Sequence, residues 1–214
     1  PALLWCDTRT HEECEEITRR VGLSRLRNWV SNPVLEGFTL PKILWVKKHE
    51  PKIYSRIAQV LLPKDYIRYR MTGTYAMEMS DASGTVYFDV RNRRWSSELL
   101  KVLGLPVSWF PPVYESQDIC GELTSSSAKV LGLLPGTPVV GGGADNTCGA
   151  VGNGIIRTGE VMASLGTSGV FFAHSDTVKV DPKMRVHSFC HSVPKKWYLM
   201  GVMLSAGMSL RWYR

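Results

Sequence analysis

The residues best suited to chemistry lie in the stretch 138-PVVGGGADNTCGAVGNG-154, where Asp145 and Asn146 follow three consecutive glycines by one residue. Glycine in or beside a strand often marks a place where a ligand or another backbone comes close. A carboxylate can accept a proton from a hydroxyl group, and a neighbouring amide can hold a second hydroxyl. The stretch therefore predicts a site at which Asp145 acts on a hydroxylated ligand.

Asp145 also has an ordinary structural interpretation. An acidic residue between a strand and a helix is a common N-cap, and Asn146 is a frequent turn residue. By itself the acid leaves both interpretations open. The functional one is favoured by the glycines, which leave room beside a carboxylate at the carboxyl end of a strand, where open α/β sheets hold their sites.

A second candidate is the turn 166-GTSG-169. Its simplest interpretation is a four-residue hairpin loop. The hydroxyls of Thr167 and Ser168, together with backbone N–H groups between two glycines, also form an anion cradle of the kind that holds phosphate. An acid for a hydroxyl and a cradle for a phosphate indicate a kinase-like pair.

Alternating strands and helices must position these two candidates, which favours the α/β class. In the first part of the chain we expect a strand at 2–5, a helix at 10–22 that starts with a capping box of Thr10 and Glu13, a helix at 40–49, a short helix after Pro51, a strand at 58–62 and a helix at 63–73. A strand at 85–90 follows, and then two helices that end in the same phrase, KVLGL at 101–105 and 129–133, each with a glycine stop.

From Pro138 onward the pattern predicts a strand that enters the glycines and a helix after Asp145. Two strands then meet at 166–169, two more lie at 185–192 and 197–203, and a last helix starts at Ser205.

Composition excludes several classes of protein. The 214 residues are 44% hydrophobic and 21% charged, enough to bury a substantial core. No apolar run approaches the roughly 18–20 residues that cross a bilayer, and the start 1-PALLWCDTRT-10 lacks the pattern of a signal peptide. We therefore expect a cytoplasmic protein without a membrane partner.

The net charge of +7 raises the question of an anionic partner. The basic residues form short clusters, such as Lys47-Lys48 and Lys195-Lys196, scattered among acids. A nucleic-acid binder concentrates its charge on one face and interleaves aromatic residues. The pattern indicates solvated faces and no nucleic-acid partner, and it leaves an anionic small ligand open.

Metal and dinucleotide motifs are also missing. The five cysteines are odd in number and contain no CxxC pair, which argues against disulfides and zinc. In the run from His187 to His191, a strand would place the two histidines on one side and Cys190 on the other, so we expect ordinary packing there. The chain contains neither a Walker loop nor a GxGxxG fingerprint.

The segment 37-GFTLPKILWVKKH-49 resembles the first signature of the FGGY carbohydrate kinases, through Thr39, Lys42 and the Trp45-Val46 pair. The phrases 61-LLPKDYIRYRMTG-73, 79-MSDASGT-85, 164-SLGTSG-169 and 187-HSFCH-191 resemble those members that act on D-xylulose. So does Asn146 after the acid, where glycerol kinases carry glutamine. The resemblance covers essentially all 214 residues.

The resemblance implies two actin-like (ribonuclease H-like) α/β domains with a cleft between them. Residues 1–153 would be part of the N-terminal sugar-binding domain without its opening strands, and residues 154–214 the start of the C-terminal ATP-binding domain. Asp145 would be the catalytic base and a sugar ligand, and Asn146 a further sugar ligand. Gly166, Thr167 and Ser168 would contact the phosphates of ATP. The implied activity transfers the γ-phosphoryl group of ATP, with Mg²⁺, to D-xylulose, in a full enzyme that could be a homodimer.

The sequence also departs from the family pattern. It lacks an Asp-x-Gly-Thr phosphate and metal loop, a Met-His-Gly-Gln sugar contact, the second signature and the adenine-binding glycines. We therefore expect the middle of such a kinase, less than half of it and inactive alone. Two alternatives stay open: a non-catalytic actin-like module that binds a sugar or a partner, and a family kinase for another ketose or polyol.

Overall fold

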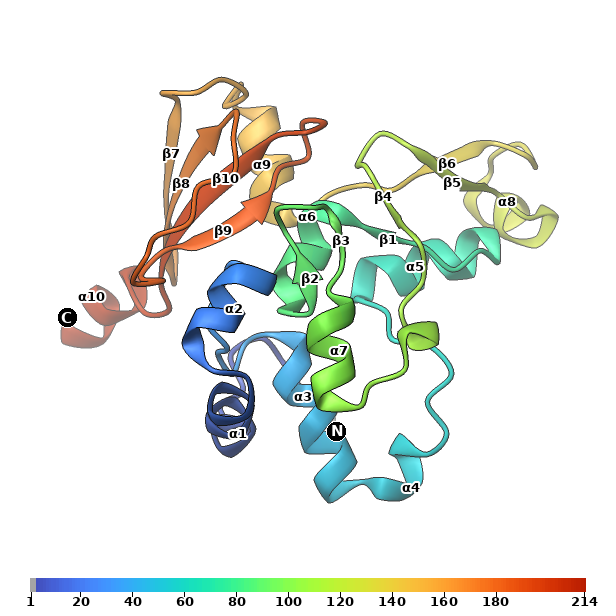
Figure 1. Cartoon of the computed structure of the whole chain (residues 1–214). Coiled ribbons are helices and arrows are strands. Elements are labelled where there is room, and N and C mark those ends of the chain that lie inside the picture. Colours follow the sequence, from blue (N-terminus) through green and yellow to red (C-terminus); the bar gives the residue numbers. More distant parts are fainter. Residues whose placement is uncertain (1–2) are drawn as a thin grey trace.

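The computed structural model describes residues 3–214, which form a mainly helical part followed by a four-stranded sheet (Figure 1). As far as β6 (Pro138–Val140), the chain consists of helices of up to 11 residues, joined by strands of only two to four residues. Longer strands follow, of seven residues in both β8 (Gly169–Ser175) and β10 (Trp197–Met203). The α/β class is confirmed, although helices and strands are segregated more than simple alternation predicts.

The helical part packs around one apolar core. Its elements are α1 (His11–Val21), α2 (Leu23–Trp29), α3 (Thr39–His49), α4 (Pro51–Tyr54) and α7 (Ser97–Leu103). In α1 the buried apolar side chains are Cys14, Ile17 and Val21, which follow the helical period and share one face. They meet Leu40 of α3 and Leu99 of α7 in the same cluster.

The predicted capping box at the start of α1 is wrong, although the helix begins where expected. Thr10 makes no cap; its hydroxyl donates a hydrogen bond to Glu36 O at 3.3 Å. The Glu13 side chain is buried, with Oε1 3.7 Å from Lys48 Nζ. Groups from distant parts of the chain have replaced the local partners that a capping box needs.

Two predicted strands are absent. Residues 3–5 form no strand, and Ala2, the first residue of that prediction, lies outside the described residues. Residues 58–62 belong to no strand pair, although Val60 donates its N–H to Trp109 O at 2.8 Å. Val60 packs against the helical core, so its apolar side chain is covered without a β ladder.

The helix stops were predicted correctly. α5 (Pro63–Thr72) begins with proline and ends at Gly73, whose φ of 72° is left-handed. α7 and α8 (Ser125–Leu131) end at Gly104 and Gly132, each with a φ of 67°. The repeated phrase KVLGL therefore does encode the same stop twice.

Pairs of short strands connect the helices. β1 (Met77–Glu78) pairs in parallel with β4 (Val113–Tyr114), β2 (Phe88–Asp89) pairs antiparallel with β3 (Arg94–Trp95), and β5 (Ile119–Glu122) pairs antiparallel with β6. Between them lie α6 (Met79–Ala82) and the 3-10 turns η1 (Ser83–Thr85) and η2 (Val107–Trp109). The strand predicted at 85–90 shrinks to β2 because Val86 has a left-handed φ of 64°.

The sheet has the strand order β7-β8-β10-β9, with antiparallel neighbours throughout. β7 (Val161–Leu165) and β9 (His187–Cys190) are its edges. α9 (Asp145–Gly152) lies against it, and α10 (Gly207–Tyr213) lies beyond one end (Figure 1). The predicted elements from Pro138 onward are therefore confirmed. Within residues 3–214 every helix is too short or too polar to span a bilayer.

The two sides of β9 face different neighbours. Phe189 packs with Ala150 of α9, whereas Cys190 packs with Phe88 and Val90 of the helical part. The prediction that Cys190 faces away from its neighbours in the HSFCH run is confirmed. Among residues 3–214, no three His, Cys, Asp or Glu side chains are grouped so that they could hold a metal ion.

Candidate functional site

Asp145 is the first residue of α9 and is exposed to solvent. Ala144, not Asp145, occupies the N-cap position, and no side chain caps the helix. The Oδ1 atom of Asp145 accepts hydrogen bonds from Asn146, at 2.7 Å from its N–H and 3.2 Å from its Nδ2. Within residues 3–214 its Oδ2 atom has no hydrogen-bond partner. The N-cap interpretation is therefore wrong, and one carboxylate oxygen is available to a ligand.

Other atoms of the protein lie close to the glycines that precede Asp145. A Cβ atom on Gly141 would lie 2.9 Å from Glu115 O, and one on Gly143 would lie 2.4 Å from Ser192 Oγ. Gly142 between them has a left-handed φ of 78°. The close approach predicted from the glycines is confirmed, but protein groups come close at Gly141 and Gly143, and no ligand is needed to explain them.

The strand before the glycines also differs from the expected setting. β6 belongs to a two-stranded antiparallel pair with β5, not to an open parallel sheet. Asp145 still follows the carboxyl end of that strand, after the four residues 141–144. The site is therefore built where a strand gives way to a helix, without a row of parallel strand ends to support it.

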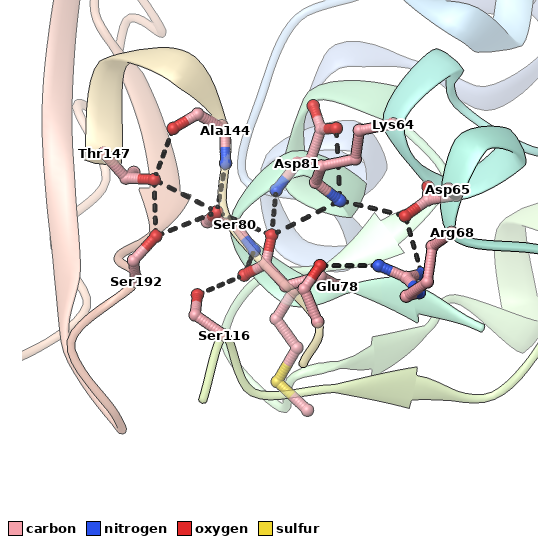
Figure 2. A network of polar contacts seen from close by, with 12 residues as sticks. Lys64, Asp65, Arg68, Glu78, Ser80, Asp81, Ser116, Ala144, Thr147 and Ser192 are labelled. Atoms are coloured by element: carbon pink, nitrogen blue, oxygen red, sulfur yellow. Dashed lines mark hydrogen bonds and ion pairs between the residues drawn. The ribbon is translucent and has the colours of Figure 1, made fainter. Parts of the chain in front are cut away.

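A buried carboxylate supports this junction instead. Glu78, at the end of β1, accepts hydrogen bonds from Ser80 N at 2.7 Å, Ser80 Oγ at 2.8 Å, Asp81 N at 3.2 Å and Ser116 Oγ at 2.7 Å (Figure 2). Ser80 Oγ in turn accepts the N–H of Ala144 at 2.9 Å. The residue directly before Asp145 is therefore attached to a carboxylate that is fully buried.

A buried arginine holds the other end of the glycine segment. Arg68 donates to Gly141 O at 2.5 Å, to Ala76 O at 2.5 Å and to Asp65 Oδ1 at 2.8 Å. Lys64 Nζ lies 2.9 Å from the same Asp65 oxygen (Figure 2). A buried ion pair of this kind is costly to break, because the remaining charge is left without a partner. The backbone from Gly141 to Ala144 is thus fixed at both ends.

Burial also shifts the pKa of Asp81, the acid next to this cluster. Desolvation raises the pKa of Asp81, and the Lys64 ammonium, 3.4 Å from its Oδ2, opposes that shift. Lys64 therefore neutralises part of the negative charge that Glu78, Asp65 and Asp81 bring together.

The turn 166–168 joins β7 to β8, as the hairpin interpretation predicted. Its carbonyls accept hydrogen bonds from the start of α10: Gly207 N donates to Gly166 O at 3.0 Å and Ala206 N to Thr167 O at 2.8 Å. A Cβ on Gly207 would lie 2.3 Å from Gly166 O, so the contact requires a glycine there. Thr167 is exposed, and within residues 3–214 its N–H and that of Ser168 form no hydrogen bond.

The two candidate groups do not touch each other. Ala150 of α9 packs against Phe172 and Tyr198 of the sheet, whereas the turn contacts the start of α10. In Figure 1, α9 lies beside the upper part of the sheet and α10 below its lower end. Among the described residues no hydrogen bond or ion pair joins Asp145 or Asn146 to residues 166–168.

Sequence reasoning missed the side chains that support Asp145, chiefly Glu78, Ser80 and Ser192. Ser80 lies in the phrase 79-MSDASGT-85, which stood out only through its family resemblance. Glu78 lies one residue before it, and nothing in the local pattern marks a buried carboxylate there. Besides the nearby Ser80 and Asp81, Glu78 binds Ser116, which is 38 residues away, and the Ala144 N–H that Ser80 accepts lies 64 residues from Ser80.

Residues 1–152 match the FGGY family of carbohydrate kinases, N-terminal domain. That match covers more than half of the 214 residues. The chain belongs to the FGGY family of carbohydrate kinases. Its fold is accordingly the actin-like α/β fold of these sugar kinases.

Individual relatives agree with this assignment. The chain is 48% identical over 212 residues to the xylulose kinase of Escherichia coli (strain K12), and the aligned region covers 99% of this chain and 43% of that protein. It is 45% identical over 213 residues to the xylulose kinase of Bacillus subtilis (strain 168), covering 100% of this chain and 42% of that protein. A crystal structure of a kinase from Brucella ovis superposes with a TM-score of 0.92 at 42% identity, covering 98% of this chain and 43% of the other.

The chain therefore spans less than half the length of the relatives that it matches.

Proposed function

We propose that the protein is an ATP-dependent sugar kinase that transfers the γ-phosphoryl group of ATP to D-xylulose and forms D-xylulose 5-phosphate. The carrying observation is the exposed Asp145 carboxylate, with one free oxygen, on a segment whose backbone is fixed by buried side chains. The substrate assignment is supported by identities of 45–48% to two xylulose kinases.

In the proposed mechanism Asp145 is the base. Its Oδ2 atom takes the proton from the attacking hydroxyl of the sugar as that oxygen forms a bond to the γ-phosphorus and the bond to the ADP oxygen breaks. The side-chain amide of Asn146 holds a second hydroxyl of the sugar.

The turn 166–168 supplies the phosphate contacts in this proposal. Thr167 is exposed, and the N–H groups of Thr167 and Ser168, which make no hydrogen bond within residues 3–214, can reach phosphate oxygens together with the two hydroxyls. Gly166 contributes its backbone to the turn, because its N–H donates to Ser168 O at 2.9 Å. The docking of α10 onto the turn carbonyls holds its shape without occupying the hydroxyls. Phosphoryl transfer requires mainly positioning and charge neutralisation, and these groups provide part of both.

Mg²⁺ accompanies ATP in such reactions. No group of metal-ligating side chains occurs among residues 3–214, and the exposed turn offers neutral donors. Mg²⁺ is therefore part of the proposal only as the ion bound to ATP, and no residue of this chain is assigned to hold it.

The proposal includes the arrangement of domains. Residues 1–153 belong to the sugar-binding domain and residues 154–214 begin the ATP-binding domain, so Asp145 lies near the boundary between them. The enzyme is cytoplasmic, and its full-length form could pair as a homodimer.

The test is an ATP-consumption assay on the protein expressed over its whole reading frame. D-xylulose should be turned over with a higher kcat/KM than other ketoses and polyols. A higher value for another sugar would move the protein to a different member of the same family. Binding of D-xylulose with no ATP consumption on any sugar would instead establish the non-catalytic module and overturn the proposal.

A further inference from the structure

Three hydroxyl groups form a cluster beside the start of α9: Thr147 Oγ1 lies 2.5 Å from Ser192 Oγ, and Ser80 Oγ lies 3.3 Å from Thr147 Oγ1 and 3.4 Å from Ser192 Oγ (Figure 2). Thr147 Oγ1 donates to Ala144 O at 2.8 Å, so in its 2.5 Å contact with Ser192 Oγ it is the acceptor. Ser80 Oγ donates to Glu78 Oε2 at 2.8 Å and accepts the Ala144 N–H. Side chains therefore bind both backbone polar groups of Ala144.

The three hydroxyls come from distant parts of the chain. Ser80 lies in α6, Thr147 in α9, and Ser192 follows β9. Thr147 is fully buried and Ser80 nearly so. A buried hydroxyl that loses its hydrogen-bond partner costs about 1–3 kcal/mol, so separating the three hydroxyls is unfavourable.

Close contacts within this cluster and with Gly143 restrict the side chain of Ser192. Its Oγ occupies the space that a Cβ on Gly143 would need, 2.4 Å away from that position. Contact on one side with Gly143 and on the other with Thr147 makes Ser192 and residues 143–147 one packed unit. Asp145 is in the middle of that unit, directly after Ala144.

We propose that Ser192 is a positioning residue for Asp145, acting through Thr147. This inference rests on the proposed role of Asp145 as a base. Ser192 is attached to β9 of the sheet, on the far side of the proposed domain boundary from Asp145. Movement of the sheet, which carries the turn 166–168 at its other end, is thereby transmitted to the carboxylate. A misplacement of 1 Å is enough to reduce turnover by about 10²-fold.

The first test is kinetic, on the protein expressed over its whole reading frame. Ser192→Ala and Thr147→Val should each lower kcat by about tenfold and leave both KM values within about twofold, because they misplace the base without removing a substrate contact. Thr147→Ser keeps the hydroxyl and should restore kcat to within about threefold of the wild type. The double variant Ser192→Ala/Thr147→Val should be no worse than either single one, because both interrupt the same link.

Ser116→Ala is the matched control. It removes another serine hydroxyl from the same buried carboxylate, Glu78, but does not touch Ala144 or Thr147. Its kcat should stay within about twofold of the wild type. Equal losses of kcat in Ser192→Ala and Ser116→Ala, or a wild-type kcat in Ser192→Ala, would overturn the positioning role.

The second test does not depend on activity. Amide hydrogen exchange in the peptide that spans 144–148 should be faster in Ser192→Ala and unchanged in Ser116→Ala. If the wild-type protein does not phosphorylate D-xylulose, the proposed function fails while this measurement still decides whether Ser192 holds the segment. Unchanged exchange in Ser192→Ala would overturn the inference even in an active kinase.

Discussion

The segment 141–147 and the turn 166–168 are held in different ways. The first is tied by side chains from elsewhere: Arg68 binds Gly141 O, and Ser80 binds Ala144 N. Within residues 3–214, the hydrogen bonds that hold the second are between backbone groups, at the start of α10 and inside the turn itself. A base must be placed accurately for proton transfer, whereas a phosphate contact must leave its donors accessible. The difference in support matches the difference in proposed role.

The largest effect is expected for the 214-residue chain by itself, which should show no turnover of D-xylulose and should associate. It has no Asp-x-Gly-Thr loop and, among residues 3–214, no group of metal ligands. Large apolar side chains near the turn are open to solvent, among them Leu165 at 80% and Trp212 at 85% exposure. Light scattering and a coupled kinase assay test this. A monodisperse, active monomer would show that the chain needs no further support for either region.

Asp145→Asn should have the next largest effect, in the protein expressed over its whole reading frame. We expect kcat to fall by about 10²- to 10⁴-fold while D-xylulose and ATP still bind, because the amide cannot accept the proton. Single-turnover kinetics and equilibrium binding separate the two. Near-normal turnover would show that Asp145 is not the base, and the difference between the two regions would then have no functional meaning.

Arg68→Met tests how strongly the glycine segment is held. Asp65, buried at 1% exposure, would keep only the contact of its Oδ1 with Lys64 Nζ at 2.9 Å, and the carbonyls of Gly141 and Ala76 would lose the Arg68 donor, so the free energy of unfolding should fall by about 1–3 kcal/mol. The matched control is Arg185→Met, which removes the exposed arginine of the Asp181–Arg185 pair and should lower the free energy of unfolding by less than about 1 kcal/mol. Urea denaturation compares them. Similar behaviour of the two variants would mean that the buried pair does not anchor residues 141–144.

Thr167→Ala should affect the other region mildly. Losing one hydrogen bond to phosphate should raise the KM for ATP by about threefold to tenfold and leave the KM for D-xylulose unchanged. Ser164→Ala, on β7 just before the turn, is the control and should change neither value. An increase confined to the sugar would contradict the assignment of the turn to ATP.

The smallest effect concerns pH. Burial, and the nearby His174, lower the pKa of His191 to about 4, and its Nδ1 accepts the N–H of Val193 at 2.9 Å. Because the folded-state pKa is below the unfolded value of about 6.5, the unfolded chain binds the proton first as the pH falls. The contribution of neutral His191 to the free energy of unfolding is fully present above pH 6.5 and is lost as the pH falls toward 4. Between pH 7 and pH 5 the free energy of unfolding should decrease by about 1 kcal/mol.

Urea midpoints at pH 7 and pH 5 measure this decline, which His191→Gln should reduce. His49→Gln, at an exposed position, should leave it unchanged. Since Val193 follows Ser192, acid should loosen the segment around Asp145 before it affects the turn. An identical pH dependence in His191→Gln and the wild type would assign the decline to other groups.

Much of the secondary structure could be predicted from sequence, and the errors share a cause. Proline at the start of α5 and glycine after α5, α7 and α8 act within a few residues, so those ends were found. The strands at 3–5 and 58–62 failed because strand formation depends on a partner that the local pattern cannot show. The capping box at Thr10 failed because the Thr10 hydroxyl binds Glu36 O and the Glu13 carboxylate is buried beside Lys48, away from the backbone of Thr10.

The sequence by itself determined which residues could do chemistry: the acid and amide at Asp145 and Asn146, and the hydroxyls at Thr167 and Ser168. Only the tertiary structure decided what holds them. Glu78, Ser80 and Ser192 meet beside Ala144 from positions up to 114 residues apart, counted from Glu78 to Ser192. Hydrogen bonds between such distant residues depend on how the chain packs in space, whereas caps, turns and helical faces are set by neighbours within a few residues.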